Sequence, residues 1–221
     1  MGAPLAPEVE VEFRCGGSSV TRWLCTPEHL DDLAAGWLVG EGRIGAGDRL
    51  EAILVDADGT TVRIEHSGLR SADEVTPIKA EPVRAEAEFV DGFADPTRLR
   101  PLWSQMFAGG HLREQTGGVH TGALVVDGQV RTVREDVSRH CVIDKLVGAA
   151  RHEGLRLEDC QILLTGRVSS AIATKLARAG VPVVATMSVP TTLAASIADR
   201  AGITIIGRAR GPNPHIYRPG V

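Results

Sequence analysis

Alternating apolar and polar residues predict a small sheet in the first third of the chain. Residues 9–13 and 19–25 alternate well enough to form two strands, and a Gly-Gly turn separates them. Residues 50–55 and 60–65 form a second candidate pair around an Asp-Gly turn, which favours a tight hairpin. The pattern therefore predicts two strand pairs with other structure between them.

A helix is predicted between these two pairs. The string Thr26-Pro27-Glu28 is typical of a helix start, because threonine caps the first turn and proline suits the first helical position. We expect the helix to end at Gly40 or Gly42. Its apolar face consists of residues at helical spacing: Leu30, Leu33, Ala34, Trp37 and Leu38. Residues 66–94 show no clear period and are predicted to form a long loop or a connection between two subdomains.

The second half of the chain has a more regular pattern. Asp95-Pro96 opens a predicted helix, and residues 121–126 and 130–134 form a predicted hairpin through an Asp-Gly turn. Ser138 is placed to cap a further helix that ends near His152.

From residue 160 onward, predicted strands and helices alternate. Residues 160–165, 181–186 and 203–206 are short apolar runs, and the first is typical of a buried parallel strand. Helices are predicted over residues 169–179 and from Pro190 to Gly202. Strand–helix–strand–helix–strand is the pattern of a parallel sheet with covering helices, so the sequence predicts an α/β fold.

The length of 221 residues allows one large domain with a smaller appendage. We divide the chain into an N-terminal α+β subdomain with its connecting loop, residues 8–94, and an α/β domain, residues 95–221. A net charge of -4 gives no overall field that would favour nucleic acid or acidic membranes. No stretch approaches the ~20 apolar residues of a membrane span, and the first ten residues lack the features of a secretory signal. We therefore expect a cytoplasmic protein without nucleic-acid or membrane partners.

The motifs of several common enzyme classes are missing. Zinc catalysis is not supported, because neither HExxH nor HxE followed by PCxxC occurs. A GxSxG nucleophile elbow, a Walker A loop and a GxGxxG string are also absent. The cysteines have no metal-ligand spacing, so we expect reduced and mostly buried thiols and no metal site. They are scattered: Cys15, Cys25, Cys141 and Cys160.

Polar strings follow two of the predicted strands. Thr165-Gly166-Arg167-Val168-Ser169-Ser170 follows the first, and Thr186-Met187-Ser188-Val189-Pro190-Thr191-Thr192 follows the second. Ligands of such sheets bind where strand ends meet helix starts. Hydroxyls, an arginine and a helix N-terminus suit a phosphate or another anion. Each loop taken alone is also compatible with an ordinary capped turn.

The densest polar cluster is Arg134-Glu135-Asp136-Val137-Ser138-Arg139-His140. Helical spacing places His140 and Asp144 on one face, so that the carboxylate could orient the imidazole or raise its pKa. Cys141 could be a thiolate nucleophile if the field of the helix N-terminus reaches it. The alternatives are a capped helix with surface ion pairs and a buried, inert cysteine. His120 precedes a predicted strand, where a structural hydrogen-bonding role is the more common one.

Read together, these strings resemble the FdhD family of formate dehydrogenase accessory proteins. One such motif would be weak, whereas the set occurs in the family's order and spans about residues 8–218. The matching strings lie at residues 26–28, 32–38, 41–42, 116–120, 134–140, 144–145, 166–169, 189–194 and 213–217.

The resemblance implies a sulfurtransferase that takes sulfur from a cysteine desulfurase. Such proteins pass the sulfur to the molybdenum cofactor, bis(molybdopterin guanine dinucleotide), before its insertion into a formate dehydrogenase. The implied fold is a three-layer domain similar to that of cytidine deaminases, without the zinc. A homodimer is also implied, with pockets for the guanine nucleotide parts near its interface. The candidate cofactor-binding residues are Thr116, Gly117, His120, Arg134, Arg139, Lys145, Gly166, Arg167, Ser169, Ser188 and Thr191.

One departure from the family pattern affects the chemistry. The family carries sulfur on a CxxC in a loop that maps here to residues 66–82, and this stretch contains no cysteine. A persulfide relay needs a thiolate. The sequence therefore predicts that the binding scaffold is kept while the sulfur carrier is lost. Smaller departures are Ser138, where the family usually has glycine, and Cys141, where asparagine is common.

Three functional hypotheses remain open at this point. In the first, a maturation factor for a molybdenum or tungsten formate dehydrogenase-type enzyme binds the pterin guanine dinucleotide cofactor or a guanine nucleotide. In the second, an enzyme re-tasked from this scaffold uses His140, Asp136 or Cys141 as catalytic residues for acid–base or nucleophilic work on a small molecule. In the third, the chain is an interaction partner of a cysteine desulfurase or of a second, cysteine-bearing homologue.

Overall fold

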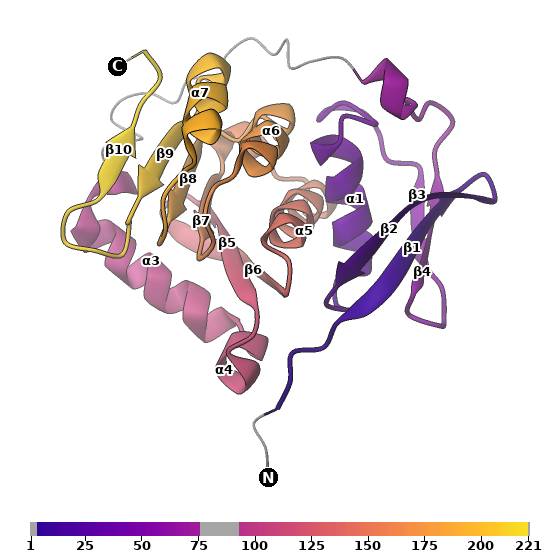
Figure 1. Ribbon diagram of the computed structural model, residues 1–221, viewed down its shortest axis with the longest axis horizontal. Coiled ribbons are helices and arrows are strands. Elements are labelled where there is room, and N and C mark those ends of the chain that lie inside the picture. The colour runs from indigo at the N-terminus through magenta and orange to yellow at the C-terminus, as the bar shows by residue number, and fades with distance from the viewer. Residues whose placement is uncertain (1–3, 76–92, 221) are drawn as a thin grey trace.

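The computed structural model describes residues 4–75 and 93–220, which form a mixed α/β structure around two sheets. The smaller sheet has the strand order β2-β1-β4-β3 (Figure 1). Its strands are β1 (Val9–Cys15), β2 (Ser18–Cys25), β3 (Ala52–Val55) and β4 (Thr61–Glu65). Both predicted strand pairs are confirmed, and β1 joins them because it pairs in parallel with β4.

Helix α1 (Leu30–Gly40) begins later than the sequence predicted. Its N-cap residue is His29, in a left-handed conformation with φ 52°, and not Thr26. Thr26 is instead held by a distant part of the chain: its amide donates to Asp136 at 3.1 Å, and its hydroxyl accepts from the amide of Val137 at 3.2 Å. The predicted cap is therefore wrong, because a long-range contact takes the groups that would have capped the helix.

The larger sheet has six strands in the order β10-β9-β8-β7-β5-β6. They are β5 (His120–Val126), β6 (Gln129–Asp136), β7 (Gln161–Leu164), β8 (Val183–Thr186), β9 (Thr204–Gly207) and β10 (His215–Tyr217). The predicted parallel arrangement of β7, β8 and β9 is confirmed, and the hairpin β5–β6 extends this sheet with β5 antiparallel to β7. The sequence did not predict β10, whose three residues are too few to establish a period.

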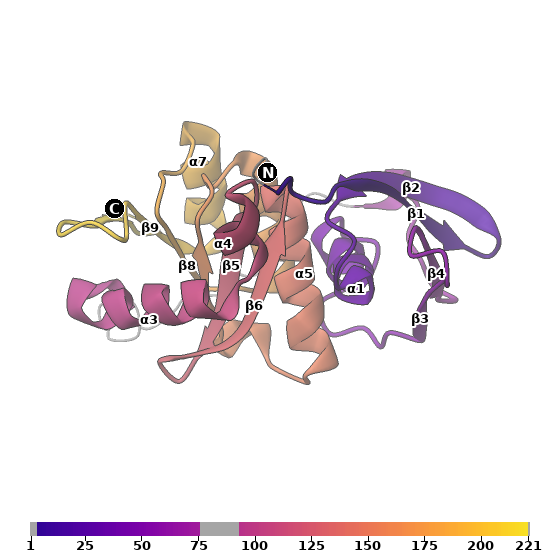
Figure 2. The ribbon, with the colours of Figure 1, turned by 90° about the horizontal axis from the view of Figure 1, so that it is seen from below.

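Helices cover both faces of the larger sheet (Figure 2). One face carries α3 (Pro96–Gly109), and the other carries α5 (Arg139–His152), α6 (Ser170–Ala179) and α7 (Thr192–Ala201). These four helices were predicted to within a few residues, whereas the short α4 (Leu112–Thr116) and the 3-10 turns Ala72–Glu74 and Leu157–Asp159 were not. None of the described helices is both long and apolar enough to cross a membrane.

Helices α1 and α5 cross with their backbones in contact. A Cβ atom on Gly36 would collide with the backbone oxygen of Asp144, and one on Gly148 would collide with the backbone oxygen of Asp32. The two glycines therefore let each helix lie directly against the other. A single cluster of buried side chains consequently runs from the smaller sheet through α1 and α5 to one face of the larger sheet.

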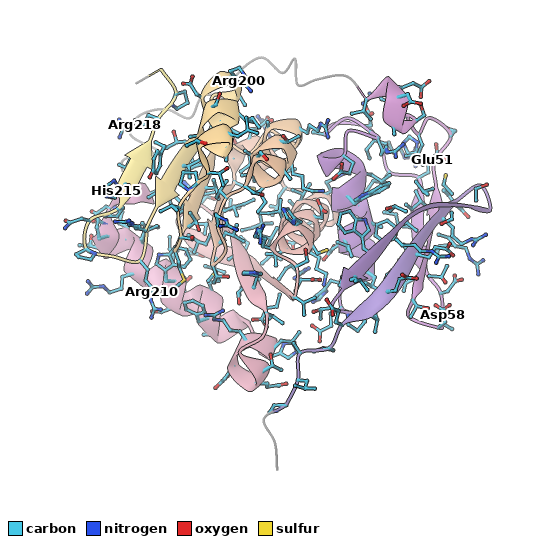
Figure 3. All side chains as sticks on the ribbon, in the orientation of Figure 1. Glu51, Asp58, Arg200, Arg210, His215 and Arg218 are labelled. Atoms are coloured by element: carbon cyan, nitrogen blue, oxygen red, sulfur yellow. The ribbon has the colours of Figure 1, made fainter. Side chains whose placement is uncertain are left out.

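Many charged side chains lie at the surface, where water solvates them. Glu51, Asp58 and Arg200 lie on the outside of the molecule in Figure 3 and are exposed. A second set of polar side chains is only partly buried. These side chains lie at one edge of the larger sheet, where β7 and β8 end.

Candidate functional site

The candidate site lies at the carboxyl ends of β7 and β8. The loops that follow these strands are joined directly: the hydroxyl of Thr186 donates to the carbonyl oxygen of Gly166 at 2.6 Å, and the amide of Thr191 donates to that of Val168 at 3.0 Å. The hydroxyl of Ser169 caps α6 by accepting a hydrogen bond from the amide of Ile172. The hydroxyl of Thr191 caps α7 in the same way, with the amide of Ala194 as donor. The structure thus brings the two predicted polar loops side by side.

A third strand end joins this edge, and the sequence analysis missed it. Arg208 directly follows β9, and its amide donates to the carbonyl oxygen of Ser188 at 2.7 Å. Its backbone has φ 50°, which turns the chain sharply at this point. The signal was available in the sequence, because a Gly-Arg pair, Gly207-Arg208, stands at the end of this strand, and another, Gly166-Arg167, follows β7 closely.

His120, Arg139 and Gly166 meet at the centre of the edge. A Cβ atom on Gly166 would lie 3.2 Å from the Cβ of Arg139 and 3.2 Å from Nδ1 of His120, so glycine leaves room for both side chains. The Nε atom of Arg139 is buried and has no hydrogen-bond partner among the described residues. An unpartnered buried donor costs free energy, and an incoming oxygen atom would satisfy it.

His140 pairs with a serine and not with the predicted aspartate. Its Nε2 atom lies 3.2 Å from the hydroxyl of Ser169. Asp144 instead accepts from the ammonium of Lys175 at 2.9 Å with both carboxylate oxygens. The prediction of a His140–Asp144 pair is therefore wrong, because helical spacing fixed the common face but not which neighbour each side chain would meet.

Both histidines of the edge are held in the neutral form. Burial lowers the pKa of His120 and that of His140, and the nearby guanidinium of Arg139 lowers both further. Arg113 adds to the effect on His120, and Lys175 adds to the effect on His140. At neutral pH each imidazole can therefore accept one hydrogen bond and donate another.

Lys175 lies at the border of this edge in a buried cluster of charges. It contacts the carboxylates of Asp144 at 2.9 Å and Glu41 at 2.7 Å, and its Nζ atom stands 5.9 Å from the ring centroid of Trp23. Burial raises the pKa of Asp144 to about 6. The cluster connects α1, α5 and α6, which gives it a structural role.

Three of the candidates predicted from the sequence are closed inside ion pairs. Asp136 and Lys145 are both fully buried and pair at 2.7 Å, and burial raises the pKa of Asp136. Arg134 binds Asp32 at 2.7 Å and is largely buried. Asp136 and Lys145 touch no solvent, which favours a structural role for this pair over the predicted catalytic and ligand-binding roles. Arg134 is already bound to a carboxylate.

Cys141 is fully buried, which agrees with the alternative that it is an inert cysteine of the core. Burial raises the pKa of its thiol, which opposes formation of the thiolate. The burial therefore favours an inert cysteine over an activated nucleophile. Cys25 and Cys160 are buried as well, and only Cys15 is partly exposed.

The remaining candidates lie around the same edge or on its flank. Arg167 is exposed in the loop after β7, and Ser188 is partly exposed in the loop after β8. Thr116 ends α4, where its hydroxyl donates to the carbonyl oxygen of Leu112 at 2.7 Å, and Gly117 follows with φ 65°. Glu135, which was not a candidate, anchors α4 by accepting three of its N-terminal amides.

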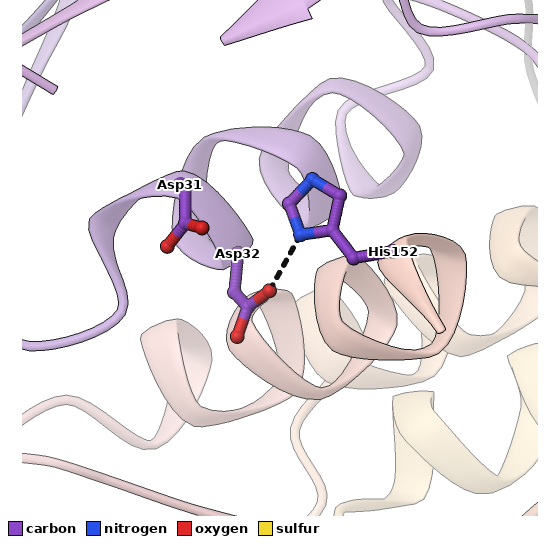
Figure 4. A group of neighbouring side chains, drawn as sticks. All are labelled: Asp31, Asp32 and His152. Atoms are coloured by element: carbon purple, nitrogen blue, oxygen red, sulfur yellow. Dashed lines mark hydrogen bonds and ion pairs between the residues drawn. The ribbon is translucent and has the colours of Figure 1, made fainter. Parts of the chain in front are cut away.

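One group of side chains has the composition of a metal site, but two of its members pair with each other and one of these also pairs with an arginine. Asp31, Asp32 and His152 stand within 4.8 Å of one another (Figure 4). Nδ1 of His152 contacts one carboxylate oxygen of Asp32 at 2.8 Å, and Arg134 contacts the other at 2.7 Å. Both oxygens of Asp32 are therefore engaged, and the group acts as a link between α1 and α5.

Comparison with known proteins gives one consistent answer. A sequence model of the FdhD/NarQ family matches residues 6–220. The sulfur carrier protein FdhD of Streptomyces avermitilis is 32% identical over 244 residues, covering 96% of this chain and 86% of that protein. The protein of the same name from Methanothermobacter thermautotrophicus is 30% identical over 224 residues, covering 95% and 87%.

A solved structure agrees in fold. The crystal structure of a formate dehydrogenase accessory protein from Desulfotalea psychrophila superposes with a TM-score of 0.78 at 22% identity, covering 98% of this chain and 88% of that one. The mixed α/β architecture predicted from the sequence is thereby confirmed. Of the loop that would carry the family's cysteines, residues 66–75 are described and contain a 3-10 turn, and residues 76–82 lie outside the described residues.

Proposed function

Because this chain belongs to the FdhD/NarQ family, we propose that it is an accessory protein for a molybdenum or tungsten formate dehydrogenase-type enzyme and binds the guanine dinucleotide form of the pterin cofactor. The bound group is cargo, which the accessory protein holds and hands on. The proposal places the guanine nucleotide part at the edge formed by the loops after β7, β8 and β9.

The buried, unpartnered Nε atom of Arg139 is the observation that carries this proposal. It belongs to a side chain that packs against Gly166 and His120, where the missing Cβ atom of the glycine leaves room for both side chains. Arg167 and Arg208 stand on the neighbouring loops, and neither has an ion-pair partner among the described residues. Guanidinium groups bind phosphate oxygens with two parallel hydrogen bonds, so these arginines suit the diphosphate of a nucleotide.

The sulfur itself requires a second protein in this proposal. A persulfide forms on a thiolate, and three of the four cysteines are buried. Cys15, the fourth, is the last residue of β1 in the smaller sheet, whereas the candidate site belongs to the larger sheet. We therefore propose that a cysteine desulfurase or a cysteine-bearing homologue brings the sulfur, while this chain, as a homodimer, holds the cofactor.

Calorimetric titration with GDP tests the binding proposal. We expect saturable binding without turnover, weakened at least about tenfold by Arg139→Gln and by Arg167→Gln, because a charge-assisted hydrogen bond contributes about 1.5–3 kcal/mol. Arg200→Gln is the matched control, since Arg200 is exposed on α7 and donates to the hydroxyl of Ser196 of its own helix. Equal affinity in all three variants would contradict the proposal.

The contact between His140 and Ser169 favours a second candidate function. A neutral imidazole 3.2 Å from a hydroxyl can act as general base and activate a serine nucleophile. No carboxylate orients the other ring nitrogen of His140 among the described hydrogen bonds, which speaks against an efficient catalytic triad. Labelling of Ser169 by a fluorophosphonate probe, abolished in His140→Gln, would support a re-tasked enzyme over the cofactor-binding role.

A further inference from the structure

A hollow lies on the side of the larger sheet that α3 covers, away from α5, α6 and α7. Arg100, Trp103, Ser104 and Phe107 line it from α3, and Arg210 lines it from the turn after β9. Figure 3 shows Arg210 beside α3. None of these residues belongs to the edge site described above, although Arg210 follows Arg208 by two positions.

The hollow carries positive charge without a matching carboxylate. The guanidinium of Arg210 lies 5.5 Å from the ring centroid of Phe107, and that of Arg113 lies at the same distance from the same ring. Neither of them, nor Arg100, forms an ion pair within the described ranges 4–75 and 93–220. Arg113 lies outside the hollow, and its guanidinium also donates to the carbonyl oxygen of Val119 at 3.2 Å. The hollow itself is lined by two cations, Arg100 and Arg210, and an anion placed between these two would be attracted to both.

Arginines of the smaller sheet differ from those of the hollow in having carboxylate partners. There the exposed Arg22 and Arg63 contact the carboxylates of Glu10 and Asp56, and the half-buried Arg14 contacts that of Glu12. At the hollow no such partner is provided by the described residues.

The floor of the hollow is held in place before any ligand arrives. The indole nitrogen of Trp103 donates to the carbonyl oxygen of Ala209 at 3.3 Å, and both residues are buried. The amide of Gly211 donates to the carbonyl oxygen of Arg208 at 2.9 Å, which closes the turn. Residues that are already held in place lose little conformational entropy when a ligand binds. A preformed site can therefore bind even a small ligand that makes few contacts.

We propose that this hollow binds the phosphate group of a small phosphorylated ligand, at a site separate from the sheet edge. Arg100 and Arg210 would donate to the phosphate oxygens, as guanidinium groups do. Ser104 adds a hydroxyl, and Phe107 offers an apolar wall to the carbon part of the ligand. This inference does not depend on the function proposed for the edge site.

Fluorescence of Trp103 reports binding directly, because its ring lines the hollow. The experiment uses the full chain with Trp23→Phe and Trp37→Phe, so that Trp103 is the only tryptophan. The probes are inorganic phosphate, pyrophosphate and GDP. Saturation by inorganic phosphate identifies a free anion as a sufficient ligand, whereas saturation by GDP alone identifies a phosphate carried on a nucleoside; either supports the proposal.

Variants decide whether the hollow is the site. We expect Arg210→Gln and Arg100→Gln to weaken the saturable change about tenfold or more, and Arg210→Lys to weaken it less. Arg98→Gln is the matched control, an exposed arginine of α3 outside the hollow. Arg139→Gln should leave the Trp103 signal intact. The absence of saturation with all three probes, or an unchanged affinity in Arg210→Gln, would overturn the proposal, and thermal unfolding of each variant confirms that it is folded.

Discussion

His120 and His140 differ from the other polar candidates because both remain half-buried beside Arg139, while Asp136 and Lys145 are closed inside an ion pair. At the scale of single residues, burial decides which groups are available. A histidine with a lowered pKa is neutral at pH 7 and gains its charge only as the pH falls. This makes the edge site sensitive to acid in a way that can be measured.

Binding of GDP is expected to tighten as the pH falls through the lowered pKa values of these histidines. Each then becomes cationic, and an anion stabilises the protonated form. The titration compares wild type with His140→Asn and His120→Asn between about pH 7.5 and about pH 5.5. The ratio of wild-type to variant affinity should rise toward low pH, and parallel curves would exclude the histidines from the site.

The same shifts have a defined sign for stability. In the folded chain the pKa of each histidine lies below its ordinary value of 6.5, so the unfolded chain binds more protons near that pH. Their contribution to the free energy of unfolding is therefore present above about pH 6.5 and is lost as the pH falls through this range.

Thiol reactivity is a second prediction at this scale. Burial raises the pKa of Cys25 to about 12 and that of Cys160 to about 11, and it raises the pKa of Cys141 as well. A thiol reagent at neutral pH should therefore react rapidly with Cys15 only. Cys15→Ser should remove the fast phase, and denaturant should make all four cysteines of the wild type reactive. Rapid labelling of Cys141 would instead support its role as a nucleophile.

At the scale of elements, the crossing of α1 and α5 determines how the N-terminal sheet is attached. Gly36 and Gly148 stand at the two points where a side chain would strike the opposite backbone. The atoms in the way belong to the main chain of a helix, which cannot move aside as a flexible side chain would. The close approach of the two helices therefore depends on these two residues.

Gly148→Ala and Gly36→Ala should each destabilise the protein by about 3 kcal/mol or more, since overpacking of a fixed backbone forces the helices apart. Urea unfolding followed by circular dichroism measures this change. Gly47→Ala is the control, because a Cβ atom there meets nothing within 4 Å and the backbone is not in the left-handed region. If Gly148→Ala unfolds at the same urea concentration as Gly47→Ala, the crossing is less tight than described.

At the scale of the whole molecule, buried charges bind the N-terminal part to the C-terminal part. Asp32 of α1 meets Arg134 and His152, while Lys145 reaches the carbonyl oxygen of Thr26 at 3.0 Å. Lys175 of α6 meets Glu41 just beyond α1. Because of these contacts and the shared core, we expect the two parts to unfold as one cooperative structure.

Removal of one partner from such a pair tests this cooperativity. Lys175→Met should cost about 3–5 kcal/mol, because it leaves Asp144 buried without a counter-charge. The double variant with Asp144→Asn should regain part of this loss. The stability of the single variant should also increase as the pH falls toward the pKa of Asp144, and that of the double variant should not. Arg156→Gln is the control, since Arg156 pairs with Glu158 at the surface.

The sequence by itself determined the elements and the likeness to one family. Turns such as Asp127-Gly128, the cap at Ser169 and the apolar face of α3 depend on residues only a few positions apart, so neighbours in the sequence suffice to predict them. The order of strands and helices after residue 160 also placed the polar loops at one edge, because parallel strands end on the same side of a sheet.

Only the tertiary structure decided which polar group meets which. Thr26 and Asp136 are 110 positions apart, and Arg134 and Asp32 are 102 apart. No local pattern encodes such pairs, because each depends on how two distant elements pack. The same reason explains why α1 begins at Leu30 and why His140 faces Ser169. A pairing across the core engages a polar group and leaves it unavailable for ligand binding or catalysis. The sequence shows only that the residue is polar.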